Sequence, residues 1–565
     1  MLCKITTFLL LAVATIEALD WWQNAVIYQI YPRSFKVSNC KLSKLYTNGA
    51  LQDSNNDGTG DLNGIIQKLD HLVDAGVTAL WLSPIYKSPQ VDFGYDISDF
   101  RDIDPLFGNL DTFKELVQKA KQKSLKIVLD FVPNHSSNEH EWFKKSEDSV
   151  PGYEDYYIWK DGDPSKPPNS WTSYFHGPAW TFSQKRKQWY LHQFASGQPD
   201  LNYHNPKVVQ EMKDVLVYWL DMGVDGFRID IISALFEHKD FPDGPEDQFV
   251  YRNDQPETYD MVYQWRTLLD KYKQTHGGDT RVMMTETYSE SEKLFPYYGN
   301  ETHNGAHFSF NFWFITKLNK LSNAGDIKSI IDQWYNDMPK KYTANWVLGN
   351  HDQHRVASRY TPEHVDGLNM IAMLLPGVAV TYNGEEIGME NGEVSWAEGW
   401  DPQGCNGNQE DWEINSRDFE RTPYHWDSSV NAGFNEGNKT WLPVSEKYKT
   451  VNLAAQRTSE RMTHYRVYQE LVKLRKLDTV KFGDLNTYAL ETNVFVFTRK
   501  LEGNSTYIAI VSVNHSETTV DLRFADLPPY LSVKIPSVQS NKPPGSIVTT
   551  NAINLVGYEA LVLAS

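Results

Sequence analysis

Short apolar stretches recur from the N-terminal region to about residue 480, and several of them follow segments with a helical spacing of apolar residues. Helices are expected at about 65–75 and 110–123, each just before such a stretch. Continuous apolar strands that alternate with helices are typical of a parallel sheet covered on both faces. The strands are expected at Val26–Tyr31, Thr78–Leu82, Lys126–Phe131, Gly226–Asp230, Arg281–Glu286, Asn345–Leu348 and Val378–Tyr382.

About eight such units over this length predict an α/β fold, a (β/α)8 TIM barrel, rather than an open doubly wound sheet. No glycine-rich dinucleotide fingerprint follows the first strand, which also weighs against the open sheet. The barrel is expected at 19–135 and 204–484. Residues 136–203 are rich in Pro, Gly, Trp and Tyr, which predicts a loop-rich inserted domain after strand 3. Residues 485–565 contain short strands separated by turn residues, which predicts a C-terminal antiparallel β-domain.

The N-terminus has the pattern of a secretory signal peptide, expected over residues 1–18. One cation precedes a short apolar run, Ile5–Ala14, and Ala14 and Ala18 are small residues that suit cleavage. A signal anchor is the alternative, although the run is short for a membrane span. No later stretch is apolar for long enough to span a membrane, and the C-terminus lacks the tail of a lipid-anchor signal. We therefore expect a secreted, extracellular protein without a membrane anchor.

The net charge of the chain weighs against some classes of binding partner. The net charge is −19 with acidic and basic residues interspersed, which argues against nucleic acid or an anionic membrane as a partner. Secretion makes exposed Asn-x-Ser/Thr acceptors candidates for glycosylation, whereas Asn134 lies in a predicted catalytic loop and is expected to be unmodified. Cys40 and Cys405 could pair or stay free, because their spacing does not decide. The expected glycosylation sites are Asn300, Asn438, Asn504 and Asn514.

The segment Gly226–Asp230 is the centre of the predicted chemistry. Side chains alternate along a strand, so Arg228 and Asp230 point to the same side. An arginine cation beside an aspartate lowers the pKa of the aspartate and keeps it ionised, which suits a covalent catalyst. The alternative interpretation is a structural ion pair, since such pairs perturb pKa values as well.

The other predicted strands end in similar side chains. Catalytic residues of TIM barrels lie at the C-terminal ends of the strands. There the strand Lys126–Phe131 contains Asp130 and leads to His135, the strand Arg281–Glu286 ends in Glu286, and the strand Asn345–Leu348 leads to His351 and Asp352. Each alone could be a strand-end cap or a buried ion pair, but together they supply carboxylates, histidines and an arginine to one rim.

Two facing carboxylates and a third suit glycoside hydrolysis. Asp230 would attack the anomeric carbon. Glu286 has no cation beside it in sequence and follows an apolar strand, so a raised pKa is expected for it, as a general acid requires. The two carboxyl groups should lie about 5–5.5 Å apart if configuration is retained. Asp352, His351 and His135 would hydrogen-bond sugar hydroxyls.

An acidic loop near the N-terminus resembles a calcium loop. Oxygen-bearing residues alternate along it, and Gly58 permits a sharp turn. The loop is no EF-hand, because Gly64 stands where the twelfth-position glutamate would be. A solvated acidic turn is the alternative. The predicted ligands of Ca²⁺ or Mg²⁺ are Asp53, Asn55, Asp57, Thr59 and Asp61.

These residues together resemble the α-amylase superfamily of glycoside hydrolases, and in particular the α-glucosidase and oligo-1,6-glucosidase branch that includes secreted insect maltases. The resemblance covers essentially the whole chain after residue 18. The matching stretches are Asp130–His135, Gln198–Tyr203, Gly226–Asp230, Glu286 and Asn350–Asp352.

The resemblance implies a retaining exo-α-glucosidase that releases terminal glucose from maltose, sucrose and short α-glucosides. Asp230 would be the nucleophile, Glu286 the acid/base and Asp352 the transition-state stabiliser, with Arg417 a weaker candidate for a sugar contact. The acidic loop would be the calcium or magnesium site of the family, and no organic cofactor is implied. The implied sugar-binding residues are Asp92, Tyr95, His135, Arg228, His351 and Arg421.

Two departures from the family pattern leave alternatives open. Residues 37–52 look inserted between the first strand and the acidic loop. Ile231 stands where this branch has a small residue for α-1,4 preference or valine for α-1,6, so the linkage is undecided. The alternatives are a transglucosidase or sucrose-isomerising enzyme with the same residues, and a non-catalytic binding protein on this fold.

Overall fold

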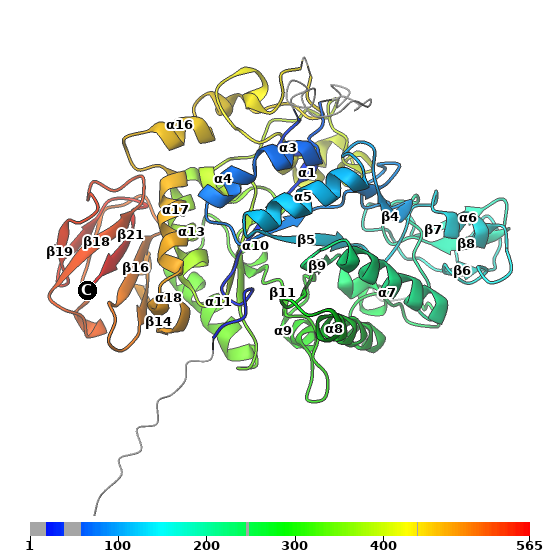
Figure 1. Cartoon of the computed structure of the whole chain (residues 1–565), viewed down its shortest axis with the longest axis horizontal. Helices are drawn as coiled ribbons and strands as arrows, with labels where there is room; N and C mark the ends of the chain where they lie inside the picture. The colour runs from blue at the N-terminus through cyan, green and yellow to red at the C-terminus, as the bar shows by residue number, and fades with distance from the viewer. Residues whose placement is uncertain (1–17, 39–57, 244–247, 438) are drawn as a thin grey trace, which may run out of the picture.

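The computed structural model describes residues 18–38, 58–243, 248–437 and 439–565. The predicted signal peptide therefore lies almost wholly outside the described residues. Figure 1 shows three parts along the longest axis, with a barrel between two smaller sheets. None of the described helices is both long and apolar enough to cross a membrane.

The central part is an eight-stranded parallel barrel, as the sequence predicted. The strands are neighbours in the order β11-β10-β9-β5-β2-β1-β13-β12. Almost all of their residues are buried, which explains why the sequence shows continuous apolar runs. The strands are β1 (Val26–Ile30), β2 (Ala79–Leu82), β5 (Lys126–Phe131), β9 (Gly226–Ile229), β10 (Val282–Thr285), β11 (Phe308–Ser309), β12 (Asn345–Val347) and β13 (Val378–Tyr382).

The sixth barrel strand, β11, has no counterpart among the predicted strands. It is two residues long, and the buried residues Phe308, Phe310 and Phe312 alternate with polar ones, which is a strand pattern unlike the continuous apolar runs of the other barrel strands. In the described part of the chain no backbone ladder joins β11 to β12. The Asn345 side chain joins them instead: its Nδ2 atom donates to Ser309 O at 2.7 Å, and its Oδ1 atom accepts from Asn311 N at 2.8 Å. A side chain therefore completes the barrel.

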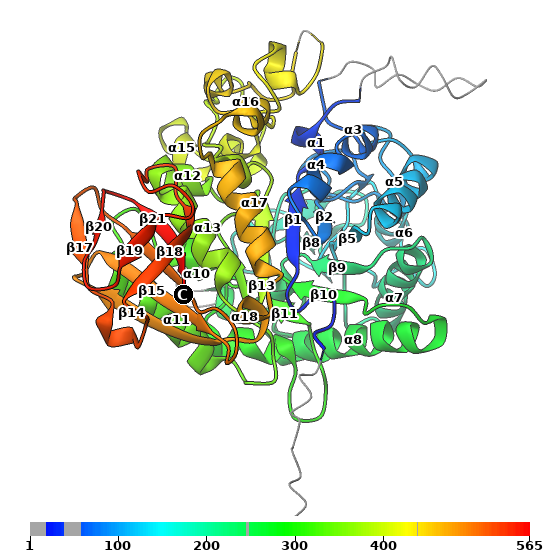
Figure 2. The ribbon, with the colours of Figure 1, turned by 60° about the vertical axis from the view of Figure 1, so that its left-hand side comes forward.

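Helices surround the barrel strands (Figures 1 and 2). The predicted helix at 65–75 is two helices, α3 and α4, separated at Lys68. The longer helices are α3 (Leu62–Gln67), α4 (Leu69–Asp74), α5 (Leu110–Gln122), α7 (Pro206–Asp221), α8 (Pro256–His276), α11 (Ala324–Asp337), α13 (Val365–Leu374), α16 (Leu453–Thr458), α17 (His464–Arg475) and α18 (Asp478–Phe482). Shorter ones are α1 (Pro32–Phe35), α9 (Ser291–Leu294), α10 (Trp313–Thr316), α12 (Val356–Arg359), α14 (Pro402–Cys405) and α15 (Trp412–Asn415).

Between β5 and α7 the chain forms a small separate unit. It has a helix, α6 (Glu141–Glu147), and an antiparallel sheet of β6 (Trp159–Lys160), β8 (Gln188–Leu191) and β7 (Trp180–Ser183). Its tryptophans form a core of their own around Trp171 and Trp180. An isolated bridge between His135 and Asp200 ties the two ends of this excursion together beside the barrel. A further short sheet, β3 (Tyr86–Lys87) with β4 (Asp99–Ile103), follows β2.

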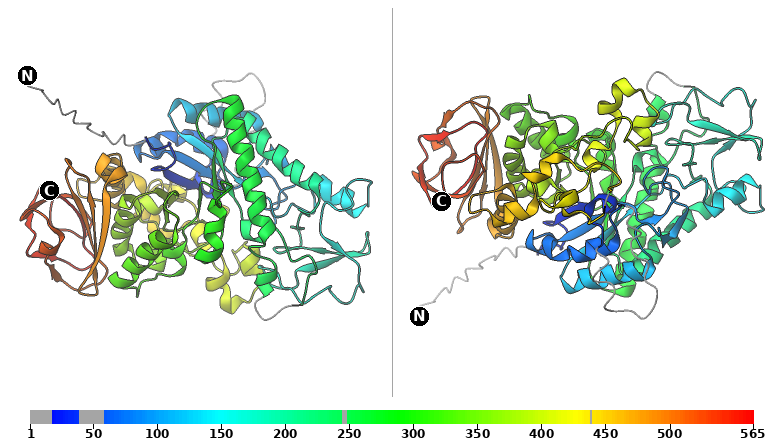
Figure 3. Two further views of the ribbon diagram at one scale, coloured as in Figure 1. Left: turned by 90° about the horizontal axis from the view of Figure 1, so that it is seen from below. Right: turned by 90° about the horizontal axis from the view of Figure 1, so that it is seen from above.

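The C-terminal part is an antiparallel six-stranded sheet, again as predicted, and a two-stranded sheet packs with it. It lies at the end of the molecule opposite the inserted sheet in the views of Figures 1 and 3. Helices α11, α13 and α17 contact it from the barrel side. The strands are β14 (Asp484–Leu490), β15 (Val494–Lys500), β16 (Tyr507–Ser512), β17 (Thr518–Val520), β18 (Tyr530–Pro536), β19 (Ile547–Thr549), β20 (Ile553–Leu555) and β21 (Ala560–Ala564).

Candidate active site

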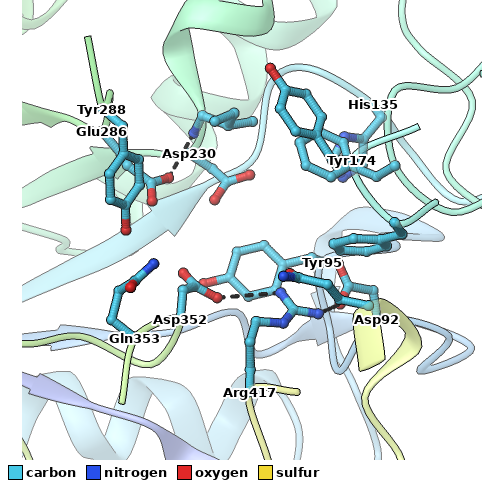
Figure 4. A pocket seen from close by; sticks show the side chains of 14 residues that line it. Asp92, Tyr95, His135, Tyr174, Asp230, Glu286, Tyr288, Asp352, Gln353 and Arg417 are labelled. Atoms are coloured by element: carbon cyan, nitrogen blue, oxygen red, sulfur yellow. Dashed lines mark hydrogen bonds and ion pairs between the residues drawn. The ribbon is translucent and has the colours of Figure 1, made fainter. Parts of the chain in front are cut away.

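The C-terminal ends of the barrel strands bring the three predicted catalytic residues together. Asp230 directly follows β9, Glu286 directly follows β10, and Asp352 lies in the loop after β12. All three line one cavity (Figure 4). Loops at the ends of the other strands supply the remaining predicted residues, which are Asp92, Tyr95, His135, His351 and Arg421.

The Arg228 guanidinium lies among three carboxyl groups. Its Nη1 atom donates to Oδ1 of Asp130 at 2.7 Å and to Oδ1 of Asp230 at 2.5 Å, and its Nη2 atom lies 2.6 Å from Oε2 of Glu286. This arrangement follows from the register, because Arg228 on β9 pairs with Asp130 on β5 and with Met284 on β10. No cation is adjacent to Glu286 in sequence, but Arg228 is adjacent to it in space.

Burial decides the protonation of the two facing carboxyl groups. Burial raises the pKa of Asp230 well above its usual range, and Glu286 and Asp130 add to this, although Arg228 opposes it. Arg228 does lower the pKa of Asp230, but burial and the carboxyl groups of Glu286 and Asp130 outweigh it, so the prediction of a net lowering is wrong. Burial also raises the pKa of Glu286 against the opposing effect of Arg228, which is the direction predicted for a general acid.

The contacts of Glu286 leave one of its oxygens for chemistry. Its Oε2 atom accepts from the backbone N–H of Ile231 at 2.9 Å and lies beside Arg228. The same carboxyl group is close enough to Asp230 for a hydrogen bond between them. With both donors on Oε2, a proton on Oε1 can be presented to a ligand in the cavity.

Asp352 faces this pair across the cavity (Figure 4). Its Oδ1 atom accepts from Arg421 Nη2 at 2.7 Å and from Arg417 Nη1 at 3.3 Å. Burial alone would raise the pKa of Asp352, but His351 and the two arginines lower it below its usual value. The cavity therefore places an ionised carboxylate opposite Asp230 and Glu286, the two carboxyl groups that share Arg228.

Hydrogen bonds between Asp92, Gln198 and Arg417 close one end of the cavity. Oδ1 of Asp92 accepts from Arg417 Nη2 at 2.9 Å, and its Oδ2 accepts from Gln198 Nε2 at 3.0 Å. The same Gln198 nitrogen lies 3.1 Å from Nε2 of His135. Burial lowers the pKa of His135 to about 3, so this imidazole is neutral. The four side chains form a polar wall suited to hydroxyl groups.

Three of the predicted sugar contacts lie behind the cavity wall and touch the residues that form it. Arg228, His351 and Arg421 are buried and do not line the cavity. The His351 ring stacks on Tyr95, with centroids 5.5 Å apart, and its Nε2 atom lies 2.6 Å from the Tyr95 hydroxyl. Arg421 Nε donates to the His351 backbone oxygen at 2.6 Å. Arg417, the weaker candidate in the sequence, lines the cavity.

The cavity has a volume of about 280 Å³. Sequence reasoning did not assign several of its residues. Tyr174, Phe175 and Phe194 come from the inserted unit, whose aromatic richness was the only signal. Tyr288 and Gln353 lie two residues and one residue from predicted catalytic residues. The cavity is lined by Asp92, Tyr95, His135, Tyr174, Phe175, Phe194, Asp230, Ile231, Glu286, Tyr288, Asp352, Gln353, Gln403 and Arg417.

The predicted metal ligands are only partly described. Asp53, Asn55 and Asp57 lie outside the described residues, whereas Thr59 and Asp61 are buried. Asp61 caps α3 by accepting from Gly64 N at 2.7 Å, and its other oxygen accepts from Ser38 Oγ at 2.8 Å. The metal site stays a prediction.

The other predicted sites stay predictions as well. Asn300 and Asn504 are exposed, Asn514 is half-buried, and Asn438 lies outside the described residues. The side chain of Asn134 is buried, which fits its expected lack of modification. Cys405 is at the surface, and Cys40 lies outside the described residues, as does most of the segment 37–52.

Known proteins resemble this chain over nearly its full length. Maltase 1 of Drosophila virilis is 45% identical over 97% of this chain and 87% of its own. The salivary alpha-glucosidase of Aedes aegypti is 41% identical over 99% and 97%. The crystal structure of the trehalulose synthase MutB from Pseudomonas mesoacidophila MX-45 superposes with a TM-score of 0.84 at 28% identity, covering 97% of this chain and all of that one.

A family model makes the classification firm. The model of the α-amylase catalytic domain matches residues 29–483, which span the barrel and the inserted unit. Asp230, Glu286 and Asp352 all lie within this match. Because the model covers most of the chain, the protein belongs to the α-amylase family.

Proposed function

We propose that this protein is a retaining exo-α-glucosidase that releases terminal glucose from maltose, sucrose and short α-glucosides. The observation that carries the proposal is the set of three carboxyl groups, Asp230, Glu286 and Asp352, around one cavity with a polar closed end. Relatives named maltase and alpha-glucosidase support it.

In the first step Asp230 attacks the anomeric carbon as Glu286 protonates the departing glycosidic oxygen. Glu286 supplies this proton, because its raised pKa favours the protonated carboxyl group. Once that proton has left, Arg228 stabilises the Glu286 carboxylate through its contact at 2.6 Å. Asp352 stays ionised and stabilises the positive charge that develops on the sugar ring.

In the second step Glu286 acts as a base and activates a water molecule, which releases glucose from Asp230. The two displacements restore the α-configuration. Arg228 touches both carboxyl groups and so keeps them adjacent, which suits the short separation of a retaining enzyme, about 5–5.5 Å, rather than the wider gap that admits a water in inverting enzymes.

The closed end of the cavity explains why one glucose would be removed at a time. Asp92, His135 and Arg417 would receive the hydroxyl groups of the non-reducing glucose, since they are buried polar groups at the end of the cavity. A longer chain cannot continue past this wall. Cleavage is therefore expected at the terminal residue only.

Proton NMR tests the proposal directly. Purified protein is incubated with maltose, isomaltose and sucrose in separate samples, and the anomeric signals are followed from the first minutes. We expect α-glucose to appear before β-glucose. Initial β-glucose would contradict the retaining mechanism, and no glucose from any sugar would favour the non-catalytic binding protein.

The matched variant is Asp230→Asn, which keeps the shape of the side chain but removes the nucleophile. We expect the rate to fall at least about a thousandfold with the melting temperature little changed. Asp521→Asn, an exposed change in the C-terminal part, serves as the control. Normal turnover by Asp230→Asn would overturn the mechanism.

A second candidate function is glucosyl transfer or isomerisation, which uses the same first step. The solved trehalulose synthase matches 97% of this chain, and trehalulose is an isomer of sucrose. In the NMR experiment with sucrose, this activity would give a new disaccharide instead of free glucose and fructose.

We also propose that the protein is secreted and binds a structural Ca²⁺ or Mg²⁺ ion in the loop 53–61. Salivary relatives support secretion. Prolonged chelation is expected to lower the melting temperature more than it lowers activity at moderate temperature, because the described ligands Thr59 and Asp61 do not line the cavity. Unchanged melting with and without chelator would remove the metal proposal.

A further inference from the structure

A pair of buried carboxyl groups lies behind the active-site cavity and has no part in the reaction described so far. Asp200 and Glu237 are both buried, and neither lines the cavity. Asp200 belongs to the last part of the inserted unit, whereas Glu237 lies in the segment that follows Asp230. The two carboxyl groups are close enough for a hydrogen bond to each other. The pair therefore connects two segments that have different roles in the site.

One side-chain amide contacts both carboxyl groups. Nε2 of Gln193 lies 2.9 Å from Oδ2 of Asp200 and 3.1 Å from Oε1 of Glu237. The same nitrogen lies 2.9 Å from the backbone oxygen of Ala234, in the 3-10 turn that follows Ile231. The backbone N–H of Gln193 donates to Oδ1 of Asp200 at 3.1 Å. These contacts attach the inserted unit to the segment that follows the proposed nucleophile.

The geometry of the pair requires a proton between its two carboxyl groups. Two carboxylates at one buried site repel each other, so one of them keeps its proton and donates to the other. Burial raises the pKa of Glu237 well above its usual range and that of Asp200 to about 6, although Arg252 opposes both shifts. Nη1 of Arg252 itself donates to Thr172 O at 2.8 Å. Glu237 is therefore the donor and Asp200 the acceptor.

Asp200 also supports the closed end of the cavity. An isolated bridge pairs its backbone with that of His135. Two residues before Asp200, the Gln198 side chain donates to Oδ2 of Asp92 at 3.0 Å and lies 3.1 Å from Nε2 of His135. The polar wall proposed to receive the glucose hydroxyl groups is thus built on the segment that Glu237 contacts.

We propose that Glu237 is a positioning residue: through its hydrogen bond with Asp200 it fixes the glucose-binding end of the cavity relative to the nucleophile Asp230. Glu237 does not line the cavity and acts only through Asp200. A glucose ring held by the fixed wall then presents its anomeric carbon to Asp230 in a reactive geometry. The inference rests on the proposed function, because it takes the closed end of the cavity to bind glucose.

Substitutions at position 237 separate the hydrogen bond from the bulk of the side chain. Glu237→Gln keeps an N–H donor for Asp200, whereas Glu237→Leu fills similar space without one. Asp240→Leu is the matched control, since Asp240 is an exposed carboxyl group three residues later in the same segment. Each full-length variant is assayed for KM and kcat with maltose and for inhibition by D-glucose, which would occupy the closed end alone.

For Glu237→Leu we expect KM for maltose and Ki for glucose to rise together by about fivefold, because the wall loses a buried hydrogen bond. In Glu237→Gln both constants should stay within about twofold of the unmodified values, since the amide replaces the donor. Asp240→Leu should match the unmodified protein. Neither constant depends on the fraction of folded enzyme, so a merely structural role would lower the apparent kcat and leave both constants unchanged.

A shorter acid covers the case in which Glu237→Leu does not fold. Glu237→Asp keeps the carboxyl group but withdraws it by one methylene group, and Ki for glucose should rise about threefold. Unchanged Ki values in Glu237→Asp and Glu237→Leu overturn the inference. Equal losses in Glu237→Gln and Glu237→Leu overturn it as well, because the donor would then not matter.

Amide hydrogen exchange gives a measurement that needs no activity. The N–H of Leu201, next to Asp200, donates to Asn134 O at 3.0 Å behind the polar wall. We expect this amide to exchange faster in Glu237→Leu than in the unmodified protein, and at the unmodified rate in Glu237→Gln. Equal exchange in all three proteins would overturn the inference. If the unmodified protein hydrolyses no α-glucoside, the proposed function fails instead, and the exchange of Leu201 decides the inference separately.

Discussion

Ile231 combines a side chain that lines the active-site cavity with an unusual backbone. Its φ is 32° and its ψ is 51°, in the left-handed region, which is rare for a β-branched residue. This conformation brings its N–H to Oε2 of Glu286 at 2.9 Å. Strained residues of this kind cluster at functional sites, where the surrounding structure holds them. The strain therefore positions the proposed acid/base residue.

Two truncations of Ile231 measure this strain. Both remove the side chain, but alanine keeps a Cβ atom that the left-handed region disfavours. We expect Ile231→Gly to be more stable than Ile231→Ala by about 1 kcal/mol in denaturant unfolding. At Ile232, which lies in the following 3-10 turn, the order should be the ordinary one, with alanine more stable. Alanine more stable than glycine at 231 would show that no strain is stored there.

Glu385 and Glu386 are adjacent and buried, yet their surroundings shift their pKa values in opposite directions. Burial raises the pKa of Glu385 to about 8. Burial also acts on Glu386, but hydrogen bonds from His71, Tyr424 and Tyr28 outweigh it and lower the pKa. Glu385 therefore contributes stability at low pH that is lost as pH rises through about 8. Glu386 contributes stability above the unfolded pKa that is lost as pH falls through its lowered folded pKa.

This contrast predicts opposite effects of the same substitution. At pH 8.5, Glu385→Gln should raise the melting temperature relative to the unmodified protein and raise the free energy of unfolding by roughly 1–3 kcal/mol. At pH 5 both quantities should change little. Glu386→Gln should lower the melting temperature at neutral pH. Calorimetric melting at both pH values checks the pair. The same sign for both variants at pH 8.5 would contradict the assignment.

At the scale of elements, two buried arginines bind the last turn of α13, and one of them, Arg499, joins the barrel to the C-terminal sheet. Arg499 on β15 donates to Leu374 O at 2.7 Å, at the C-terminus of α13, and to Gly483 O at 2.8 Å. Arg475 at the end of α17 donates to Met373 O, also in the last turn of α13, at 2.5 Å. The two cations satisfy carbonyl groups that a helix end leaves unpaired and oppose its negative dipole.

Removal of one of these cations should loosen the junction. We expect Arg499→Met to cost roughly 2–3 kcal/mol, since two buried carbonyl groups lose charged donors. The neighbouring Lys500→Met is the control, because Lys500 is exposed and its contact with Asp526 is a surface pair worth about 0–1 kcal/mol. Chemical unfolding measures both. Equal effects would mean that the junction does not depend on Arg499.

The elements that sequence revealed are those whose burial leaves a periodic or continuous apolar pattern. β5 and β9 are such strands, and so their terminal residues Asp130 and Asp230 could be placed on one rim. β11 was missed because Phe308, Phe310 and Phe312 alternate with polar residues and so form no continuous apolar run like those of the other barrel strands. The division of the helix at Lys68 was equally hidden, since the apolar spacing continues across it.

At the scale of the whole molecule, sequence identified residues at strand ends but not their surroundings. Arg228 and Glu286 are 58 positions apart and touch only because β9 and β10 are neighbours. The pKa of Asp230 likewise depends on carboxyl groups from three strands, which no local pattern contains. The inserted unit supplies Tyr174 and Phe194 across a long excursion, so the active-site cavity is complete only once the chain has folded.

The side-chain closure between β11 and β12 has a consequence for how the barrel opens. Elsewhere, neighbouring strands share several backbone hydrogen bonds, but here the Asn345 amide carries the connection. Thermal fluctuations should therefore separate these two strands before any others, and the amide hydrogens of Ser309 and Asn311 should exchange with solvent sooner than those of β5. Asp352 lies in the loop that follows β12, so the region of early exchange includes the strand that leads to one of the three carboxyl groups.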